Sequence, residues 1–350
     1  MANSASAIDI FSFGDADEPL QHGGDLAAAR SLFPNAPDPF IDLSTGINPN
    51  PYPLPGLPPE IFARLPEPAD VVRLAGIAAA SYGAPSAHHV VPAPGTQILL
   101  PLLCGLVAPG PAAILAPTYG EHARAAALAG HEVTEARDLS DIGDARLVLV
   151  ANPNNPDGRL WPKDDLLALA NTLGARRGLL VVDEAFMDVG PPEASCAGML
   201  APGNIAVLRS FGKFFGLAGV RLGFALAAPP LVRRIGARLG PWAVSGPALA
   251  LGAQALADRD WIDGSRRRLA LAAARLDALL RDRGLTVVGG TPLFRLVQTP
   301  AAGALFQHLG RAGILTRQFA DNRHWLRFGL PADESQWQRL QVAMAEFRAD

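Results

Sequence analysis

The feature that most constrains how this chain folds is a series of short strand-like runs, most of them apolar at every position. Segments of helical periodicity separate several of these runs, at Thr96–Val107, Glu121–Ala129 and Lys163–Arg176. Because a strand without polar alternation is covered on both faces, the runs predict a buried sheet. Their alternation with helices predicts an α/β fold with a mostly parallel sheet. The predicted strands are Ala112–Ala116, Glu132–Glu135, Leu147–Val150, Leu179–Val182, Ile205–Leu208 and Leu222–Leu226.

The rest of the chain is expected to form an arm before this domain and a smaller domain after it. Residues 1–60 are expected to lack regular structure, because Gly23, Gly24 and a series of prolines disfavour helices and strands. Residues 61–245 make the large domain, which begins with a helix near Val71–Tyr82. Residues 246–350 start with a long helical stretch that bridges to a small α+β domain. The elements expected there are a helical Pro247–Arg283, strands at Leu285–Val288, Leu293–Val297 and Trp325–Phe328, and helices at Ala304–Arg311 and Glu334–Arg348.

The composition excludes several classes of protein. Hydrophobic residues make up 49% of the 350 residues, enough for a large core and unlike a disordered chain. The net charge of -3 leaves no basic excess to bind a nucleic-acid backbone. Two cysteines, Cys104 and Cys196, cannot form a disulfide framework or a cysteine zinc site, and no metal is expected. Because neither a signal peptide nor a run long enough to span a bilayer is found, we expect a cytoplasmic enzyme with a small-molecule substrate.

The stretch Leu208–Gly223 carries the strongest chemical signal. Lys213 follows a predicted strand and lies among glycines and phenylalanines. Burial disfavours an ammonium, so a lysine in apolar surroundings has a lowered pKa and can attack a carbonyl to form a Schiff base. Ser210 and Arg221 are close enough along the chain to hold a phosphate beside it. The alternative is a lysine that extends from a loop into solvent.

Two further polar stretches follow predicted strands. Asp183 and Glu184 come directly after one apolar strand, and Asn155 lies in a rigid turn with two Asn-Pro steps after another. Ligands of open α/β sheets bind at the carboxyl ends of the strands. A carboxylate there can hold a protonated ring nitrogen, and an amide can donate to a ligand oxygen. Helix capping by the acids and a purely structural turn are the alternatives.

Two segments complete a candidate ligand site. Gly95, Thr96 and Gln97 open an apolar helix and present backbone N–H groups to which a phosphate can bind, although a plain helix cap has the same pattern. Tyr119 follows a strand and can lie flat on a planar ring. With Lys213 and the acids, these groups supply what pyridoxal phosphate needs: an amine, a carboxylate, a ring platform and phosphate ligands.

In the order and spacing of these residues, the chain resembles the fold-type I aminotransferases, the aspartate aminotransferase superfamily, over nearly its whole length. The resemblance implies a three-layer αβα large domain with a mostly parallel sheet, a smaller α+β C-terminal domain and a homodimer. It implies that Lys213 bonds to the aldehyde of pyridoxal 5′-phosphate. Asp183 would pair with the pyridine nitrogen, and Asn155 would donate to the ring hydroxyl oxygen.

The same resemblance assigns the cofactor phosphate and the ring face. The phosphate ligands it implies are Ser210, Arg221, Thr96 and the backbone at 95–97. Tyr119 is expected to stack on the ring. His122 is the second candidate for that face, or it supports Asp183.

Within this superfamily the chain is similar to the histidinol-phosphate aminotransferase branch, and in particular to the threonine-phosphate decarboxylases of cobalamin biosynthesis. The segments that carry this similarity are residues 22–25, 43–49, 183–188 and 313–317. The similarity implies substrate-binding roles for His22, Gly23 and Asn48 on one side of the site, and for Arg317 and Arg327 on the other. We assign Arg327 mainly to a carboxylate and Arg317 mainly to a phosphate; the competing candidate is Arg323.

Two departures favour the decarboxylase branch. Many relatives have a tyrosine where this chain has Phe186, and histidinol-phosphate aminotransferases carry a Tyr-Pro-Asp motif where residues 65–67 are Leu-Pro-Glu. We therefore expect decarboxylation of L-threonine O-3-phosphate. An aminotransferase of the histidinol-phosphate type is the alternative. A pyridoxal-phosphate-binding protein without turnover is a more remote one, and a fused DNA-binding regulator is not expected.

Overall fold

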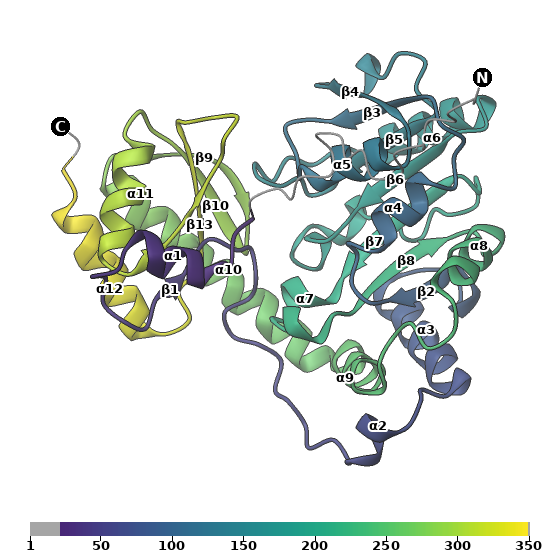
Figure 1. Ribbon diagram of the computed structural model, residues 1–350, viewed down its shortest axis with the longest axis horizontal. Helices are drawn as coiled ribbons and strands as arrows, with labels where there is room; N and C mark the ends of the chain where they lie inside the picture. The colour runs from purple at the N-terminus through teal and green to yellow at the C-terminus, as the bar shows by residue number, and fades with distance from the viewer. Residues whose placement is uncertain (1–21, 349–350) are drawn as a thin grey trace, which may run out of the picture.

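The computed structural model, described here for residues 22–348, has a large domain built on a seven-stranded sheet (Figure 1). The strand order is β2-β8-β7-β6-β5-β3-β4. The five strands from β7 to β4 are parallel to their neighbours, whereas β8 runs antiparallel to both β2 and β7. The strands are β2 Val90–Ala93, β3 Pro111–Leu115, β4 Glu132–Ala136, β5 Leu147–Ala151, β6 Leu179–Asp183, β7 Ile205–Ser210 and β8 Gly223–Ala227.

Helices cover both faces of this sheet. Alternate side chains of each central strand therefore belong to two separate clusters of buried apolar residues, one on each face. In β6, Leu180 and Val182 belong to one cluster and Leu179 and Val181 to the other. The first cluster includes side chains of α3, α6 and α9, and the second those of α4, α5 and α8. The predicted three-layer αβα domain is confirmed. The helices are α3 Pro68–Tyr82, α4 Leu99–Cys104, α5 Glu121–Leu128, α6 Lys163–Ala175, α7 Phe211–Phe214, α8 Pro229–Leu239 and α9 Gly246–Ala257.

The long helical stretch expected after Pro247 is two helices, α9 and α10 (Arg259–Asp282). Asp258 lies at the break, where its carboxylate accepts hydrogen bonds from Trp261 N (3.0 Å) and Tyr52 Oη (3.1 Å). Capping by a carboxylate allows the chain to begin a second helix in a new direction. The small domain then adds an antiparallel sheet in the order β12-β13-β10-β9. Its elements are β9 Thr286–Thr291, β10 Phe294–Gln298, α11 Ala302–Arg311, β11 Ile314–Leu315, β12 Arg317–Gln318, β13 Trp325–Gly329 and α12 Glu334–Glu346.

The N-terminal strap, defined here as residues 22–59, packs against the small domain. Its expected lack of regular structure is wrong at α1 (Leu26–Leu32) and β1 (Ile41–Asp42), since β1 pairs in parallel with β11. Asp25 caps α1 by accepting a hydrogen bond from Ala28 N at 2.8 Å. The strap continues past a short helix, α2 (Glu60–Ala63), into the large domain (Figure 1). Within residues 22–348, no helix is both long and apolar enough to cross a bilayer.

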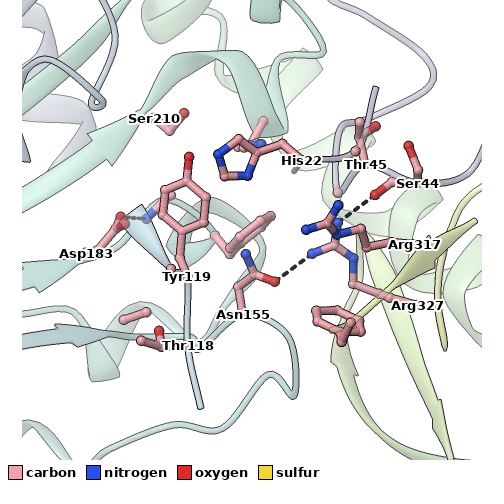
Figure 2. Close-up of a pocket in the computed structure, with 18 of the residues that line it drawn as sticks. His22, Ser44, Thr45, Thr118, Tyr119, Asn155, Asp183, Ser210, Arg317 and Arg327 are labelled. Carbon is pink, nitrogen blue, oxygen red and sulfur yellow. Dashed lines mark hydrogen bonds between the residues drawn. The ribbon is translucent and has the colours of Figure 1, made fainter. Parts of the chain in front are cut away.

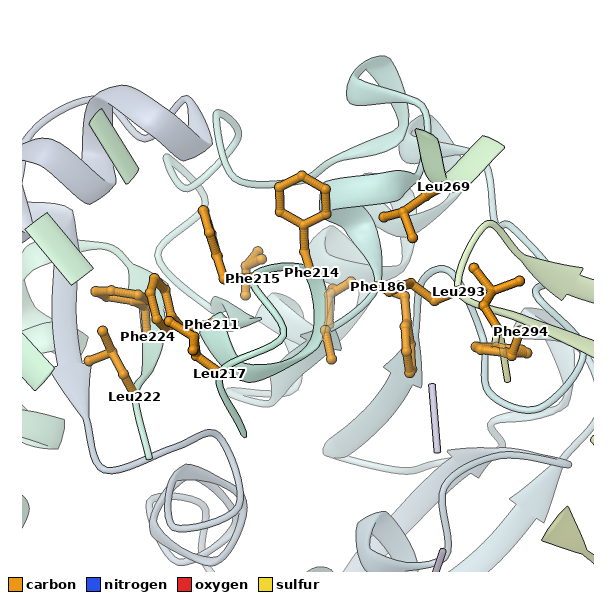
Figure 3. Packing of buried hydrophobic residues seen from close by; sticks show 14 of the residues in the cluster. Phe186, Phe211, Phe214, Phe215, Leu217, Leu222, Phe224, Leu269, Leu293 and Phe294 are labelled. Carbon is orange, nitrogen blue, oxygen red and sulfur yellow. The ribbon is translucent and has the colours of Figure 1, made fainter. Parts of the chain in front are cut away.

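An aromatic cluster packs beneath the turn that carries Lys213 (Figure 3). Phe215 stacks on Phe211 at 4.5 Å between ring centroids and on Trp261 of α10 at 5.5 Å. Tyr52 of the strap packs edge-on against Trp261 at 5.1 Å. Rings from the strap, the lysine turn and α10 therefore share one core, which fixes the turn relative to the bridging helix.

A buried ionic cluster lies at the carboxyl ends of β6 and β7. Arg209 donates to Glu184 and to Asp188, each at 3.0 Å, and its guanidinium lies 4.4 Å from the centroid of the Tyr82 ring. All three charged residues are at most 5% exposed. Removing one partner of such a cluster leaves an uncompensated buried charge, which costs far more than an exposed ion pair contributes.

We expect the substitution Arg209→Leu to lower the free energy of unfolding by roughly 3–5 kcal/mol, because Glu184 and Asp188 lose their buried cation. Urea unfolding of the cofactor-free protein, followed by tryptophan fluorescence, measures the change. Arg233→Leu, on an exposed position of α8, is the matched control and should shift the midpoint little. Equal shifts for the two variants would contradict this assignment.

Candidate active site

A cavity of about 770 Å³ lies between the two domains at the carboxyl ends of the parallel strands. Its lining comes from three parts of the chain: the strap, the large domain and the small domain, where it includes β12, β13 and the loop between them. The volume is in the range of small-molecule sites. Figure 2 shows Arg317 and Arg327 on the small-domain side of the cavity, facing Asn155.

Lys213 extends into this cavity from α7, directly after β7. Burial is the largest cause that lowers the pKa of its amine, to about 8, and the positive charges of Arg327 and Arg221 add to it. Asp183 acts in the opposite direction. The ring of Phe186 lies 5.8 Å from the amine. The amine is therefore partly neutral near neutral pH, as a nucleophile for a carbonyl must be.

Asp183 is the last residue of β6 and lines the same cavity. Its Oδ2 accepts a hydrogen bond from His122 Nε2 at 2.9 Å, and its Oδ1 accepts one from Ala185 N at 3.0 Å. His122 is fully buried in α5 and is not part of the cavity lining. Of the two roles considered for His122, the structure favours support of Asp183. Tyr119, which does line the cavity, remains as the candidate for the ring face.

One corner of the cavity combines backbone N–H groups, a hydroxyl and a guanidinium. Gly95, Thr96, Gln97, Ser210 and Arg221 all line it. Gly95 has a φ of 84°, a left-handed conformation that favours glycine, and a Cβ there would lie 2.8 Å from Arg221 Nη2. Arg221 itself has a left-handed conformation, with φ of 54°. Such strain at a non-glycine residue is common at ligand sites, where the surroundings impose it. The corner therefore offers the donors and the positive charge that a phosphate requires.

Asn155 and Arg327 meet across the domain boundary. Arg327 Nη1 donates to Asn155 Oδ1 at 2.6 Å, and Nη2 donates to the carbonyl of Ser44 at 2.7 Å. Burial is the largest cause that lowers the pKa of Arg327, to about 10, and the neighbouring charge of Arg317 lowers it further. Arg317 is the Cα partner of Arg327 in the pairing of β12 with β13. Two guanidiniums thus lie close together in one cavity, a costly arrangement that an anionic ligand would stabilise.

The strap supplies only part of what was predicted for it. His22 and Gly23 line the cavity, whereas Asn48 does not. In place of the expected substrate contact, the buried Asn48 side chain donates to the Phe214 carbonyl at 2.9 Å, and its backbone N–H donates to the Lys213 carbonyl at 2.9 Å. Asn48 therefore holds the turn that carries the lysine. Arg323, the competing anion ligand, also lines the cavity, from the loop before β13.

One polar residue next to the site was not predicted. Glu121, the first residue of α5, is 4% exposed and accepts hydrogen bonds from His22 and Gln97. The only local signal in the sequence was an acid in the first turn of a helix, which usually indicates favourable interaction with the helix dipole. Its contacts with the cavity residues His22 and Gln97 lie 99 and 24 residues away along the chain, so no local pattern could reveal them.

Comparison with known proteins agrees with this geometry. The family model for class I and II aminotransferases matches residues 73–344. The chain belongs to the class I and II aminotransferase family. It is 43% identical to the threonine-phosphate decarboxylase of Pseudomonas aeruginosa, over 94% of this chain and 98% of that one. It is also 43% identical to the threonine-phosphate decarboxylase of a Sinorhizobium species, over 93% of this chain and 98% of the relative.

Among solved structures, the fold is similar to that of histidinol-phosphate aminotransferase from Sinorhizobium meliloti in complex with pyridoxal-5′-phosphate. The TM-score is 0.80 at 23% identity, with 98% of each chain covered. The resemblance inferred from the motifs and the fold it implied are both confirmed. Family membership, the low pKa of Lys213 and the glycine-lined corner beside Arg221 support pyridoxal 5′-phosphate as the cofactor.

We expect the rate at which added pyridoxal phosphate bonds to Lys213 in the cofactor-free protein to rise with pH through about 8. The folded-state pKa lies below the ordinary 10.5, so the neutral, reactive amine becomes the main form above pH 8 rather than above 10.5. Stopped-flow absorbance at a series of pH values measures the rate.

The sequence offers a matched control for this measurement, since Lys163 is the only other lysine. Borohydride reduction followed by digestion should place the cofactor on Lys213 in the natural protein and in Lys163→Arg. Attachment to Lys163, or a rate that rises only near pH 10, would contradict the assignment.

Proposed function

We propose that this protein is a pyridoxal-phosphate-dependent lyase that decarboxylates L-threonine O-3-phosphate to (R)-1-aminopropan-2-yl phosphate and CO2. The observation that carries the proposal is a reactive amine, Lys213, in one cavity with two guanidiniums, those of Arg317 and Arg327. The names of the two relatives at 43% identity support the same substrate. As the resemblance implied, such a reaction belongs to cobalamin biosynthesis.

The substrate proposal rests on charge and spacing. Threonine phosphate carries a carboxylate and a phosphate about one short side chain apart, and each suits the planar fork of an arginine. Arg327 is the charged residue that lowers the pKa of Lys213 most, which favours it over Arg317 as the guanidinium nearer the lysine amine. We therefore assign the substrate carboxylate to Arg327 and the substrate phosphate to Arg317, its neighbour on β12.

When bound, pyridoxal phosphate supplies a conjugated ring that accepts the electron pair released as CO2 departs. The chain's own residues decide which bond at the α-carbon breaks, because only a bond perpendicular to the ring plane overlaps with it. Tyr119 would fix the ring face, and Arg327 would fix the carboxylate. Orientation of this kind supplies roughly 7–11 kcal/mol in favourable intramolecular reactions.

Asp183 and Lys213 would supply the negative charge and the proton that this reaction requires. Asp183, held by His122 and by the Ala185 N–H, provides a negative charge for a protonated ring nitrogen. Lys213, with a pKa of about 8, exists in both the neutral and the protonated form near neutral pH. Its neutral form would hold the cofactor through the aldehyde, and its protonated form would be able to donate a proton to the α-carbon.

Product analysis with the loaded enzyme tests this function. Threonine phosphate should release CO2 and form the aminopropanol phosphate without any added keto acid. A requirement for 2-oxoglutarate, with glutamate formed, would identify an aminotransferase. If no product forms although the cofactor is bound at Lys213, the result would favour a binding protein without turnover.

We expect Arg317→Ala to weaken use of threonine phosphate far more than use of unphosphorylated threonine, whereas Arg327→Ala should impair both. Loss of one charge-assisted hydrogen-bond partner costs about 1.5–3 kcal/mol, or roughly tenfold to a hundredfold in kcat/KM. Steady-state CO2 release with both substrates measures the ratio. Arg311→Ala, an exposed position of α11, is the control. If Arg317→Ala kept the preference for the phosphorylated substrate, Arg323 or His22 would become the phosphate ligand.

We also propose that the protein is a cytoplasmic homodimer. Both cysteines are free and buried, which suits a reducing compartment and supports the cytoplasmic location.

The exposed apolar surface supports the homodimer. Four large apolar side chains of the strap and of the segment after it are 65–68% exposed: Leu54, Phe62, Leu65 and Val72. Exposed apolar groups concentrated in one segment are typical of a protein interface. Sedimentation velocity at micromolar concentration measures the mass, and a monomer there would contradict the proposal.

A further inference from the structure

Glu121 connects three side chains of the cavity. Its Oε1 accepts a hydrogen bond from His22 Nε2 at 2.9 Å, and its Oε2 accepts one from Gln97 Nε2 at 2.7 Å. Gln97 Oε1 in turn accepts the hydroxyl hydrogen of Tyr119 at 3.2 Å. A carboxylate can only accept, so it determines which way the Gln97 amide points and leaves the amide oxygen for Tyr119.

The hydrogen bond between His22 and Glu121 also joins two parts of the molecule. His22 belongs to the strap, which is bound to the small domain through β1 and β11. The strap is held in place next to His22, because Gly24 N donates to Ser44 Oγ at 2.7 Å and a Cβ at Gly23 would lie 2.5 Å from the Ser44 carbonyl oxygen. Glu121 belongs to the large domain. The hydrogen bond therefore joins the strap to the large domain. Figure 2 shows His22 beside Tyr119, whose ring centroid lies 5.5 Å away.

Glu121 is charged despite its burial. Burial alone would raise the pKa of this carboxyl, but the hydrogen bonds from His22 and Arg124 outweigh it and hold the pKa below its usual range. A negative charge next to a cavity that is to receive a doubly anionic substrate works against binding. Its contacts with His22 and Gln97 provide a reason for its presence.

We propose that Glu121 is a positioning residue that holds the strap closed at His22 and sets the ring of Tyr119 through Gln97. This role concerns geometry and not proton transfer, since Glu121 is outside the cavity lining. Only the expected effect of Glu121 on substrate binding rests on the proposed function. The latch itself, the hydrogen bond between His22 and Glu121, can be tested without any substrate.

Substitution separates the two bonds of Glu121. In Glu121→Gln, the side chain keeps its volume, but one of its two terminal atoms becomes a donor. Arg124, which can only donate, also bonds to Oε2 at 3.3 Å, so the amide oxygen keeps that position and the amide nitrogen faces His22 Nε2, where the hydrogen bond to the charged group is lost. Glu121→Ala removes both. Glu132→Gln, an exposed position of β4, removes the same charge elsewhere and is the matched control.

Hydrogen exchange followed by mass spectrometry is the first test, on cofactor-free and cofactor-loaded protein. Loss of a hydrogen bond to a charged group should speed exchange in peptides that cover His22 to Leu26 by about tenfold. Both Glu121 variants should show this, and Glu132→Gln should not. Unchanged exchange in Glu121→Gln, the variant least disturbing to the fold, would overturn the latch.

Two further measurements distinguish positioning from general loss of structure. With threonine phosphate, Glu121→Gln should raise KM by about tenfold and change kcat less, because the strap contributes to binding. The visible circular dichroism of the bound cofactor should change alike in Glu121→Ala and Gln97→Ala, since both release Tyr119.

The combined results separate the two proposals. If the natural protein is inactive on threonine phosphate but strap exchange is faster in Glu121→Gln, the proposed function is rejected and the latch is kept. Activity with unchanged KM, exchange and dichroism in the variants would reject the latch alone.

Discussion

The meeting of strand ends at one edge of a parallel sheet is the constraint on which the site depends. Asp183 ends β6, Asn155 follows β5, and Lys213 follows β7, so groups from distant parts of the sequence lie in one cavity. The fully apolar strands bury the sheet between two helix layers. Ligand groups therefore collect where the strands end, because a polar side chain within a strand is buried and needs its own partners, as Arg209 has.

The site is complete only because the small domain and the strap close over that edge. Arg327 reaches across to Asn155 from β13, and His22 reaches across to Glu121 from the strap. The aromatic core around Phe215 and Trp261 fixes the lysine turn to the bridging helix. The same contacts that join the domains therefore set the positions of the amine and of the guanidinium opposite it.

The sequence was sufficient for features that a short segment encodes by itself. Strand-like runs predicted the strands of the large sheet except β2 (Val90–Ala93), which was not expected, and residues at their ends predicted the roles proposed for Lys213 and Asp183. It was insufficient where distant contacts decide. Asn48 lies in a segment that resembled a substrate loop, yet its amide bonds to the Phe214 carbonyl. The helical sequence pattern continues through Asp258, but the helix breaks there. The Asp258 carboxylate accepts a hydrogen bond from Tyr52, which is 206 residues away along the chain.

The electrostatics of the cavity connect substrate binding to the state of the lysine. Burial and the charge of Arg327 are the two largest causes that lower the pKa of Lys213. In the proposed reaction the substrate carboxylate pairs with Arg327 and cancels most of that charge. The pKa of the amine then rises toward its ordinary value, because one of the charges that disfavoured the ammonium is neutralised. Lys213 is thus most able to lose its proton while the cavity is empty, when it must bond to the cofactor. Once the carboxylate has departed as CO2, the charge of Arg327 would again lower the pKa of the ammonium, which would favour transfer of its proton to the α-carbon.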